Sequence, residues 1–440
     1  MARRRTVDAK IERALFSAEH AAVLVLAAGL LVIPTIVVPA LNAFRLPKEL
    51  AFRAEAVALL TVTVFWATSR CRTWTVSWRP EFLIAAAVVS WTILTVATST
   101  NRLLSIDSLI TVVAAAVIFV ATSVAAQKMS IVAVDALIVA CCVNAALVIL
   151  QELKIWNPLP PTPGATIHYG SVALLGNPND VGTFLVAPAV AAVVLAVTAS
   201  GTRRWVYAGI AVLLAAGIAA SATRTALAAL VAALIVFAAG HSRRAALASA
   251  LILALLAVVV LSPATSIGRG VRQLAAALPK RDYQKLFSER LVPFLTAIEM
   301  TRDHPLLGIG PGCFKYHFMA YRVALEHRYP KEWTRGWPEN WGEVHNDHLQ
   351  VAAETGLPGY ALFLIAIGAG GGLTRRRITR GVPAAATLET TFGRALRLPL
   401  ATVVFVICLA QFPLELAAPR LMLITLAALC MTWDRDDVAS

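Results

Sequence analysis

The stretch VGTFLVAPAVAAVVLAVT, residues 181–198, decides the fold class of this chain. Its apolar residues follow one another continuously, without the alternation of apolar and polar residues that is typical of barrel strands. A helix needs about 20 such residues to cross the roughly 30 Å of hydrocarbon in a bilayer. Because backbone polar groups in lipid are satisfied only in helices and closed barrels, the stretch predicts a transmembrane helix.

The same pattern recurs along the whole chain. With 58% hydrophobic residues, 15% charged residues and a mean hydropathy of +0.72, the composition lies far outside the range of soluble globular domains. We therefore predict an all-α polytopic membrane protein. Its twelve membrane helices are expected at roughly 20–41, 50–68, 81–98, 107–126, 130–150, 180–200, 204–221, 222–240, 244–262, 355–373, 395–412 and 415–432.

Basic residues divide unequally between the two sides of the predicted membrane. One set of short loops carries MARRRTVDAK, SRCRTWTVSWR, Lys128, TRRW, HSRR and TRRRITR, whereas the other set carries only Arg45, Lys48, Arg102 and Lys154. The positive-inside rule then places both termini in the cytoplasm. Topology and lipid headgroups account for the net charge of +14, so we expect membrane lipids and no nucleic acid as partners.

The predicted helices divide the chain into three parts. Residues 1–262 carry nine membrane helices, residues 263–350 form an external loop, and residues 351–440 carry three more helices. Long loops are translocated regardless of their charge, so the basic residues of this loop do not contradict the topology. The segments 271–287 and 289–304 show the apolar spacing of short amphipathic helices, and HPLLGIGPGCF, residues 304–314, reads as a turn region.

A polar cluster, HNDHLQVAAETG at residues 345–356, precedes the tenth membrane helix. Gly356 followed by Pro358 is a helix stop, so residues 346–354 are predicted to form a short external helix with Asn346 or Asp347 as its N-cap. The positive end of the helix dipole would keep His345 neutral and able to accept a proton. Two other readings remain: a purely structural His345, or a metal site formed by His345, His348, Asp347 and Glu343.

Arg224 is predicted to lie on the same external face. It belongs to the turn SATRTA, residues 221–226, which splits the apolar block 204–240 into two helices. An arginine at the edge of the hydrocarbon faces a bundle interior or a wet cavity, unless it extends to the lipid headgroups.

Three further cations are predicted on this face. Lys48 and Arg53 lie at the outer end of the second helix, and Arg290 lies on the amphipathic external segment. Arg53 has an alternative partner in Glu49, four residues earlier, and Arg290 has the alternative of a solvated surface charge.

HNDHLQVAAETGLPG, residues 345–359, resembles the HNxxLxxxxExG signature of the O-antigen ligase and polymerase superfamily. Four other segments resemble family elements and occur in family order: FRLPKELAFR at 44–53, GNPND at 176–180, SATRTAL at 221–227 and HPLLGIGPGCF at 304–314. The resemblance thus extends from residue 44 to residue 359.

This resemblance implies a GT-C-like, multi-span glycosyltransferase of the bacterial inner membrane that needs no metal or cofactor. An O-antigen ligase of this kind transfers a glycan from undecaprenyl diphosphate to a lipid A–core sugar at the periplasmic face, which completes lipopolysaccharide. In that picture His345 activates the acceptor hydroxyl and Arg224 holds the diphosphate. We assign Arg290, Lys48 and Arg53 to the diphosphate as well, and supporting roles to Asn346, His348 and Glu354.

The chemistry of these residue types agrees with such a reaction. Displacing a diphosphate from a sugar carbon requires a base for the incoming hydroxyl and positive charge near the leaving group, and arginine supplies that charge without a metal. One direct displacement inverts the anomeric centre. The sequence favours a ligase and leaves three alternatives: an O-antigen polymerase, a protein O-oligosaccharyltransferase, and a transporter of lipid-linked glycans.

Overall fold

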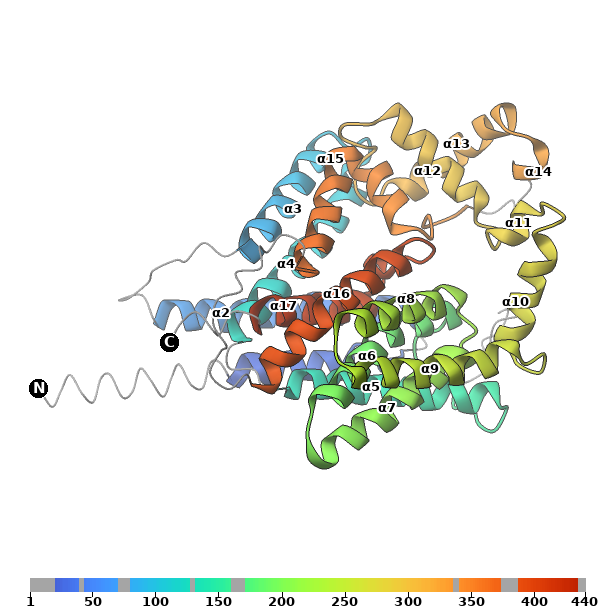
Figure 1. Cartoon of the computed structure of the whole chain (residues 1–440). Helices are drawn as coiled ribbons and strands as arrows, with labels where there is room; N and C mark the ends of the chain where they lie inside the picture. The colour runs from blue at the N-terminus through green and yellow to red at the C-terminus, as the bar shows by residue number, and fades with distance from the viewer. Residues whose placement is uncertain are drawn as a thin grey trace, which may run out of the picture.

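The structure is a computed structural model that describes residues 20–38, 43–69, 80–126, 131–159, 171–334, 340–372 and 387–433. In these ranges the chain forms helices and no strand (Figure 1). The helices that correspond to the predicted membrane segments are His20–Val32, α2 (Leu46–Ser69), α3 (Pro80–Ala97), α4 (Arg102–Ala125), α5 (Val132–Glu152), α6 (Pro178–Thr198), α7 (Gly201–Ala220), α8 (Arg224–Gly240), α9 (Arg243–Leu261), α15 (Asp347–Gly370), α16 (Leu388–Cys408) and α17 (Ala417–Trp433).

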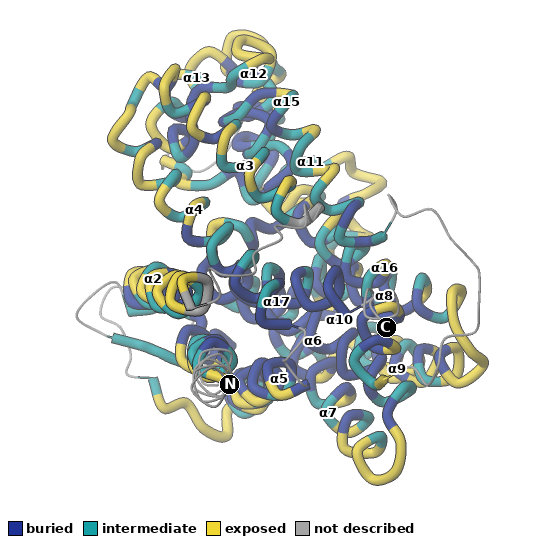
Figure 2. Tube along the Cα trace, turned by 90° about the vertical axis from the view of Figure 1, so that its left-hand side faces the viewer, coloured by how far each residue is buried: buried dark blue, intermediate teal, exposed yellow. Residues whose placement is uncertain are grey.

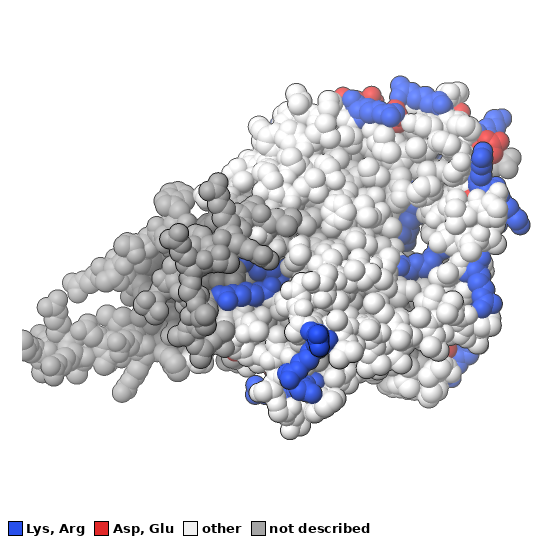
Figure 3. Space-filling model, in the orientation of Figure 1, with Lys and Arg blue, Asp and Glu red and all other residues white. Residues whose placement is uncertain are grey.

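Length and composition support a membrane location for these helices. Within the described ranges, 7 helices are long and apolar enough to cross a bilayer, and four more apolar helices are shorter. The remaining one, α2, carries four charged residues, Lys48, Glu49, Arg53 and Glu55, in its first three turns. Figure 3 shows charged side chains mainly over the loop helices and few on the flanks of the membrane helices. The all-helical polytopic membrane fold is therefore confirmed.

The helix α6 lies at the centre of the bundle. Of its apolar window, 83% is buried, the largest share among the candidate spans of the described chain. It packs against α7, α8 and α16 and is surrounded by the most buried segments in Figure 2. This position explains why its sequence has no polar face, since every side of the helix meets protein.

The long loop folds into its own small helical layer. It contains α10 (Ser266–Ala277), α11 (Tyr283–Leu286), α12 (Leu291–Asp303), α13 (Phe314–Arg328) and α14 (Lys331–Thr334). The first three match the amphipathic segments predicted from the sequence, whereas α13 and α14 were not predicted. Met300, Phe314, Phe318 and Val344 form part of a second hydrophobic core beneath them.

Side-chain contacts join this loop layer to one end of the bundle, which we call the loop end. Ser105 Oγ donates to the carbonyl of Pro311 at 2.8 Å, and Arg224 Nη2 donates to Ser288 Oγ at 2.6 Å. The SATRTA turn therefore lies at the loop end, and the predicted split of residues 204–240 into α7 and α8 is confirmed.

We expect the loop end and the opposite end to face different compartments. A cysteine introduced at Thr225 or at the exposed Glu326 should react with an impermeant maleimide added to intact spheroplasts, because both positions lie at the loop end. Ser242→Cys, at the opposite end of α8, should react only after the membrane is permeabilised. Equal labelling of Thr225→Cys and Ser242→Cys would contradict the fold.

Candidate active site

His345 occupies a strained position next to the start of α15. Its φ of 59° lies in the left-handed region, which residues other than glycine rarely adopt. The ring lies between Trp341 and Phe412, at centroid distances of 5.2 Å and 4.4 Å. No described residue forms a hydrogen bond with the imidazole, and its Nδ1 is buried. Such a polar atom without a partner is expected at a site that meets a ligand.

The residues that follow His345 fix its position. Asn346 is the N-cap of α15, since its side-chain oxygen accepts a hydrogen bond from the Leu349 amide at 3.0 Å, and its Nδ2 donates to the Leu409 carbonyl at 2.8 Å. Asp347 Oδ2 accepts a hydrogen bond from the Leu414 amide at 3.0 Å. The start of α15 is therefore tied to the turn between α16 and α17.

His348 is fully engaged within the protein. Its Nε2 lies 3.0 Å from the Phe405 carbonyl and its Nδ1 lies 3.3 Å from the Tyr360 hydroxyl. The two histidines therefore differ: His348 has a partner at each ring nitrogen and His345 has none. Among the described residues, no group of three or more His, Cys, Asp and Glu side chains comes together to hold a metal ion.

A kink in α15 joins the helix to the glycine-rich turn 304–314. Gly356 has a φ of 73°, and a Cβ atom there would lie 2.3 Å from the Leu306 carbonyl oxygen. The Glu354 carboxylate accepts hydrogen bonds from the amides of Gly312 and Phe314 at 2.8 Å and 3.1 Å. The predicted helix stop at Gly356 is thus a kink, and Glu354 holds the glycine-rich turn against it.

Arg224 and Arg290 approach each other at the loop end. Arg224 begins α8, directly after Ala222 and Thr223, and Ala222 has a φ of 54°. Thr223 Oγ1 donates to the Pro178 carbonyl at 2.9 Å, and this hydrogen bond joins the SATRTA segment to the GNPND segment. Arg290 Nη1 donates to the Ala410 carbonyl at 2.5 Å. Burial, and then the charge of Arg224, lower the pKa of Arg290 to about 10.

Arg45 is a site residue that the sequence analysis treated only as a loop charge. Its Nη1 lies 2.6 Å from Glu343 Oε1, and its guanidinium lies over the Phe412 ring at 5.5 Å. Phe412 also contacts His345, so Arg45 is close to the imidazole. No signal near Arg45 in the sequence indicates a partner 298 residues away.

Lys48 and Arg53 have partners of their own. The Lys48 ammonium donates to the Ile36 carbonyl. The Arg53 guanidinium contacts Glu49 at 3.2 Å, Asp107 at 2.7 Å and Thr111 at 2.8 Å. The structure therefore brings Arg290 and Arg45 toward His345, with Arg224 beside Arg290, and places Lys48 and Arg53 on a neighbouring wall.

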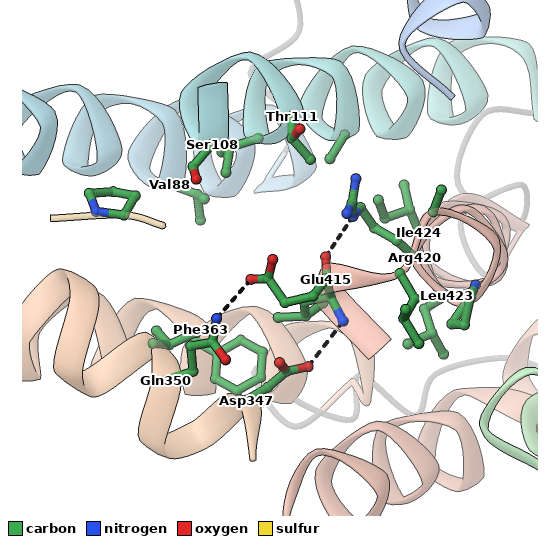
Figure 4. A pocket seen from close by; sticks show the side chains of 18 of the residues that line it. Val88, Ser108, Thr111, Asp347, Gln350, Phe363, Glu415, Arg420, Leu423 and Ile424 are labelled. Atoms are coloured by element: carbon green, nitrogen blue, oxygen red, sulfur yellow. Dashed lines mark hydrogen bonds between the residues drawn. The ribbon is translucent and has the colours of Figure 1, made fainter. Parts of the chain in front are cut away.

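That wall belongs to a cavity of about 720 Å³ between α3 and α4 on one side and α15, α16 and α17 on the other. Its polar part lies at the loop end, where Arg45, Lys48, Glu343 and Glu415 line it. Its remaining length follows the membrane helices and is apolar, with Val88, Phe119, Phe363, Ile367, Leu423 and Met431 among the lining residues. Figure 4 shows Glu415 pointing into this space toward Gln350. Such a cavity suits a molecule with a polar head and a long apolar chain.

The surroundings of His345 disfavour its charged form. Burial, and then the positive charges of Arg290 and Arg45, lower the pKa of His345 from 6.5 to about 3. The imidazole is therefore neutral at physiological pH, as predicted. Burial is the first cause and the arginine charges are the next, whereas the prediction named only the helix dipole.

The residues around His345 also resemble a known protein family. Residues 209–364 match the family model described as O-antigen ligase. This match supports the resemblance of the chain to the O-antigen ligase and polymerase superfamily. The matched residues include Arg224, Arg290, His345 and Glu354. No curated protein sequence matches the chain.

The depressed pKa of His345 predicts that the stability of the folded protein depends on pH. The unfolded chain binds a proton at this residue below about pH 6.5, whereas the folded chain does so only near pH 3. Stability should therefore fall as the pH drops through this window, by about 2 kcal/mol between pH 7 and pH 5. His345→Gln should show a shallower loss of melting temperature in detergent over that range, and His327→Gln provides a surface control. Parallel curves for the wild type and His345→Gln would contradict the assignment.

Proposed function

We propose that this chain is an O-antigen ligase that transfers a glycan from undecaprenyl diphosphate to a lipid A–core sugar at the periplasmic face of the inner membrane. The single observation that carries the proposal is the environment of His345. An imidazole without a hydrogen-bond partner lies near Arg45 and Arg290, beside the polar end of an amphipathic cavity that Arg45, Glu343 and Asp347 line. Within the superfamily, this arrangement provides a base, anion-binding cations and space for a lipid-linked substrate.

The proposed reaction is one direct displacement. His345 accepts the proton of the acceptor hydroxyl while the hydroxyl oxygen attacks the anomeric carbon. The bond from that carbon to the diphosphate oxygen breaks, and Arg224 and Arg290 stabilise the negative charge that develops on the leaving group. Arginine suits this role because its planar guanidinium forms paired hydrogen bonds with phosphate oxygens and stays charged.

The electrostatics of the site connect donor binding to base strength. An imidazole with a pKa of about 3 is a weak base near neutral pH. A diphosphate bound at Arg224 and Arg290 would offset their positive charge and raise the pKa of His345. The base would then be stronger with the donor in place than without it.

The remaining predicted residues have structural or weaker electrostatic roles in this proposal. Asn346 and Glu354 hold the start of α15 and the glycine-rich turn in place. Lys48 and Arg53 would contribute positive charge at the polar end of the cavity. Because both already have protein partners, we expect their effect on the diphosphate to be smaller than that of Arg224 and Arg290.

The identity of the acceptor distinguishes this proposal from the alternatives. Purified protein in detergent should transfer the glycan from a synthetic undecaprenyl-diphosphate donor to lipid A–core, without a membrane gradient and in the presence of EDTA. Transfer to a second lipid-linked repeat unit alone would instead indicate a polymerase, and transfer to a protein hydroxyl an oligosaccharyltransferase. A protein that moves the donor across liposomes without transfer would be a transporter.

Loss of transfer in EDTA, restored by Mg²⁺ or Mn²⁺, would contradict the role of the arginines.

The two histidines should respond differently to replacement. His345→Ala should lower kcat by roughly 10²–10⁴-fold, which is the usual contribution of a general base. His348→Ala should reduce kcat much less, and its main effect should be on melting temperature, because His348 bonds the Phe405 carbonyl and the Tyr360 hydroxyl. Wild-type turnover in His345→Ala would exclude it as the base.

A further inference from the structure

Two carboxylates of the cavity differ from the others in their contacts. Seven carboxylates line it: Glu49, Asp107, Asp180, Glu343, Asp347, Glu354 and Glu415. Arginines pair with Glu49, Asp107 and Glu343, and backbone amides donate to Asp347 and Glu354. Asp180 and Glu415 have no ion pair with any described residue.

Asp180 is buried without a hydrogen-bond partner. It lies in the first turn of α6, and its relative exposure is 5%. No described residue donates a hydrogen bond to its carboxylate, although the residue lines the cavity. A buried carboxylate is normally hydrogen-bonded or paired, so a carboxylate that faces a cavity without a donor is suited to a ligand that brings donors.

Glu415 presents its carboxylate to the same cavity. It lies in the 3-10 turn η1 (Pro413–Glu415) between α16 and α17, and its surface is exposed into the cavity. Gln350 Nε2 lies 3.2 Å from Glu415 Oε1 (Figure 4). Arg420, five residues later, does not neutralise it with an ion pair, because its guanidinium contacts Glu49 at 3.1 Å and the Leu414 carbonyl at 2.6 Å.

The two carboxylates lie on adjoining elements near His345. Helix α6 contacts η1, and both Asp180 and Glu415 are within electrostatic range of Glu343. Glu343 is paired with Arg45, which lies close to His345. Neither Arg224 nor Arg290 lines the cavity. The two carboxylates therefore line the cavity, whereas the two arginines that we propose for the diphosphate lie outside it, with Arg290 within electrostatic range of Asp180.

We propose that Asp180 and Glu415 bind the hydroxyl groups of the acceptor sugar and orient one of them toward His345. This inference rests on the proposed glycan transfer. Carboxylate oxygens can accept hydrogen bonds from neighbouring hydroxyls of an uncharged sugar ring. The part of the cavity beside Asp180 and Glu415 therefore suits the acceptor sugar, while the diphosphate lies with Arg224 and Arg290. A direct displacement requires this separation, because the nucleophile enters opposite the leaving group.

The test uses the near-isosteric variants Asp180→Asn and Glu415→Gln, with the exposed Glu326→Gln as the matched control. In steady-state transfer by the purified full-length protein, each site variant should raise the KM for lipid A–core about 10-fold, the effect of losing one strong hydrogen bond. The KM for the undecaprenyl-diphosphate donor and the melting temperature should stay at the wild-type values. Unchanged acceptor KM in both variants, or a rise in donor KM alone, would overturn the proposal.

A binding measurement separates this proposal from the proposed function. Lipid-free core oligosaccharide should give saturation-transfer NMR signals with the wild type and weaker signals with both site variants. If the wild type transfers nothing but shows this pattern, the ligase assignment fails and the sugar subsite stands. Equal signals in all variants would overturn the subsite. Binding that is lost in EDTA and restored by Mg²⁺ would make the pair a metal site, which also overturns it.

Discussion

The absence of water in the bilayer core is the constraint on which this structure depends. Backbone groups that leave a helix there need partners within the protein. The kink at Gly356 frees such groups, and distant segments take them up. The Gly310 amide donates to the Glu354 carbonyl at 3.0 Å, Trp91 Nε1 donates to the Thr355 carbonyl at 2.9 Å, and the Leu357 amide donates to the Pro305 carbonyl at 2.8 Å. The glycine-rich turn is therefore the hydrogen-bonding complement of the kink.

The same constraint explains why the strained residues gather at the loop end. Of the seven non-glycine residues with left-handed backbone in the described ranges, four lie beside or within the segments that carry the proposed site: Ala222, Ser288, Glu289 and His345. Arg224 follows the first of these, and Arg290 follows the third. Irregular backbone is tolerated where a helix ends against protein or a polar cavity, so the site occupies the places at which the bundle can depart from helical geometry.

The sequence predicted those features that depend on local chemistry. The Asn346 cap, the break at Gly356 and the split at SATRTA follow from residues a few positions apart, and the structure contains all three. Contacts between distant elements have no such signal. Nothing near Arg45 indicates Glu343, and nothing near Glu354 indicates the amides of Gly312 and Phe314. The helices α13 and α14 were missed because both are short and carry apolar residues on more than one side: Phe314 and Phe318 of α13 face the loop core, whereas Met319 and Val323 are exposed.

Most residues of the signature HNxxLxxxxExG have structural roles, and one has a proposed chemical role. Its asparagine caps α15, its glutamate holds the glycine-rich turn, and its glycine makes the kink. Only its histidine, His345, lacks a partner within the described structure. A match to this signature therefore reports the scaffold and the proposed donor chemistry. Asp180 and Glu415, which we assign to the acceptor, lie outside the matched residues 209–364. If Glu415 contributes to acceptor recognition, ligases and polymerases can share the signature and differ at this end of the cavity, whereas Asp180 belongs to the GNPND segment that resembles a family element.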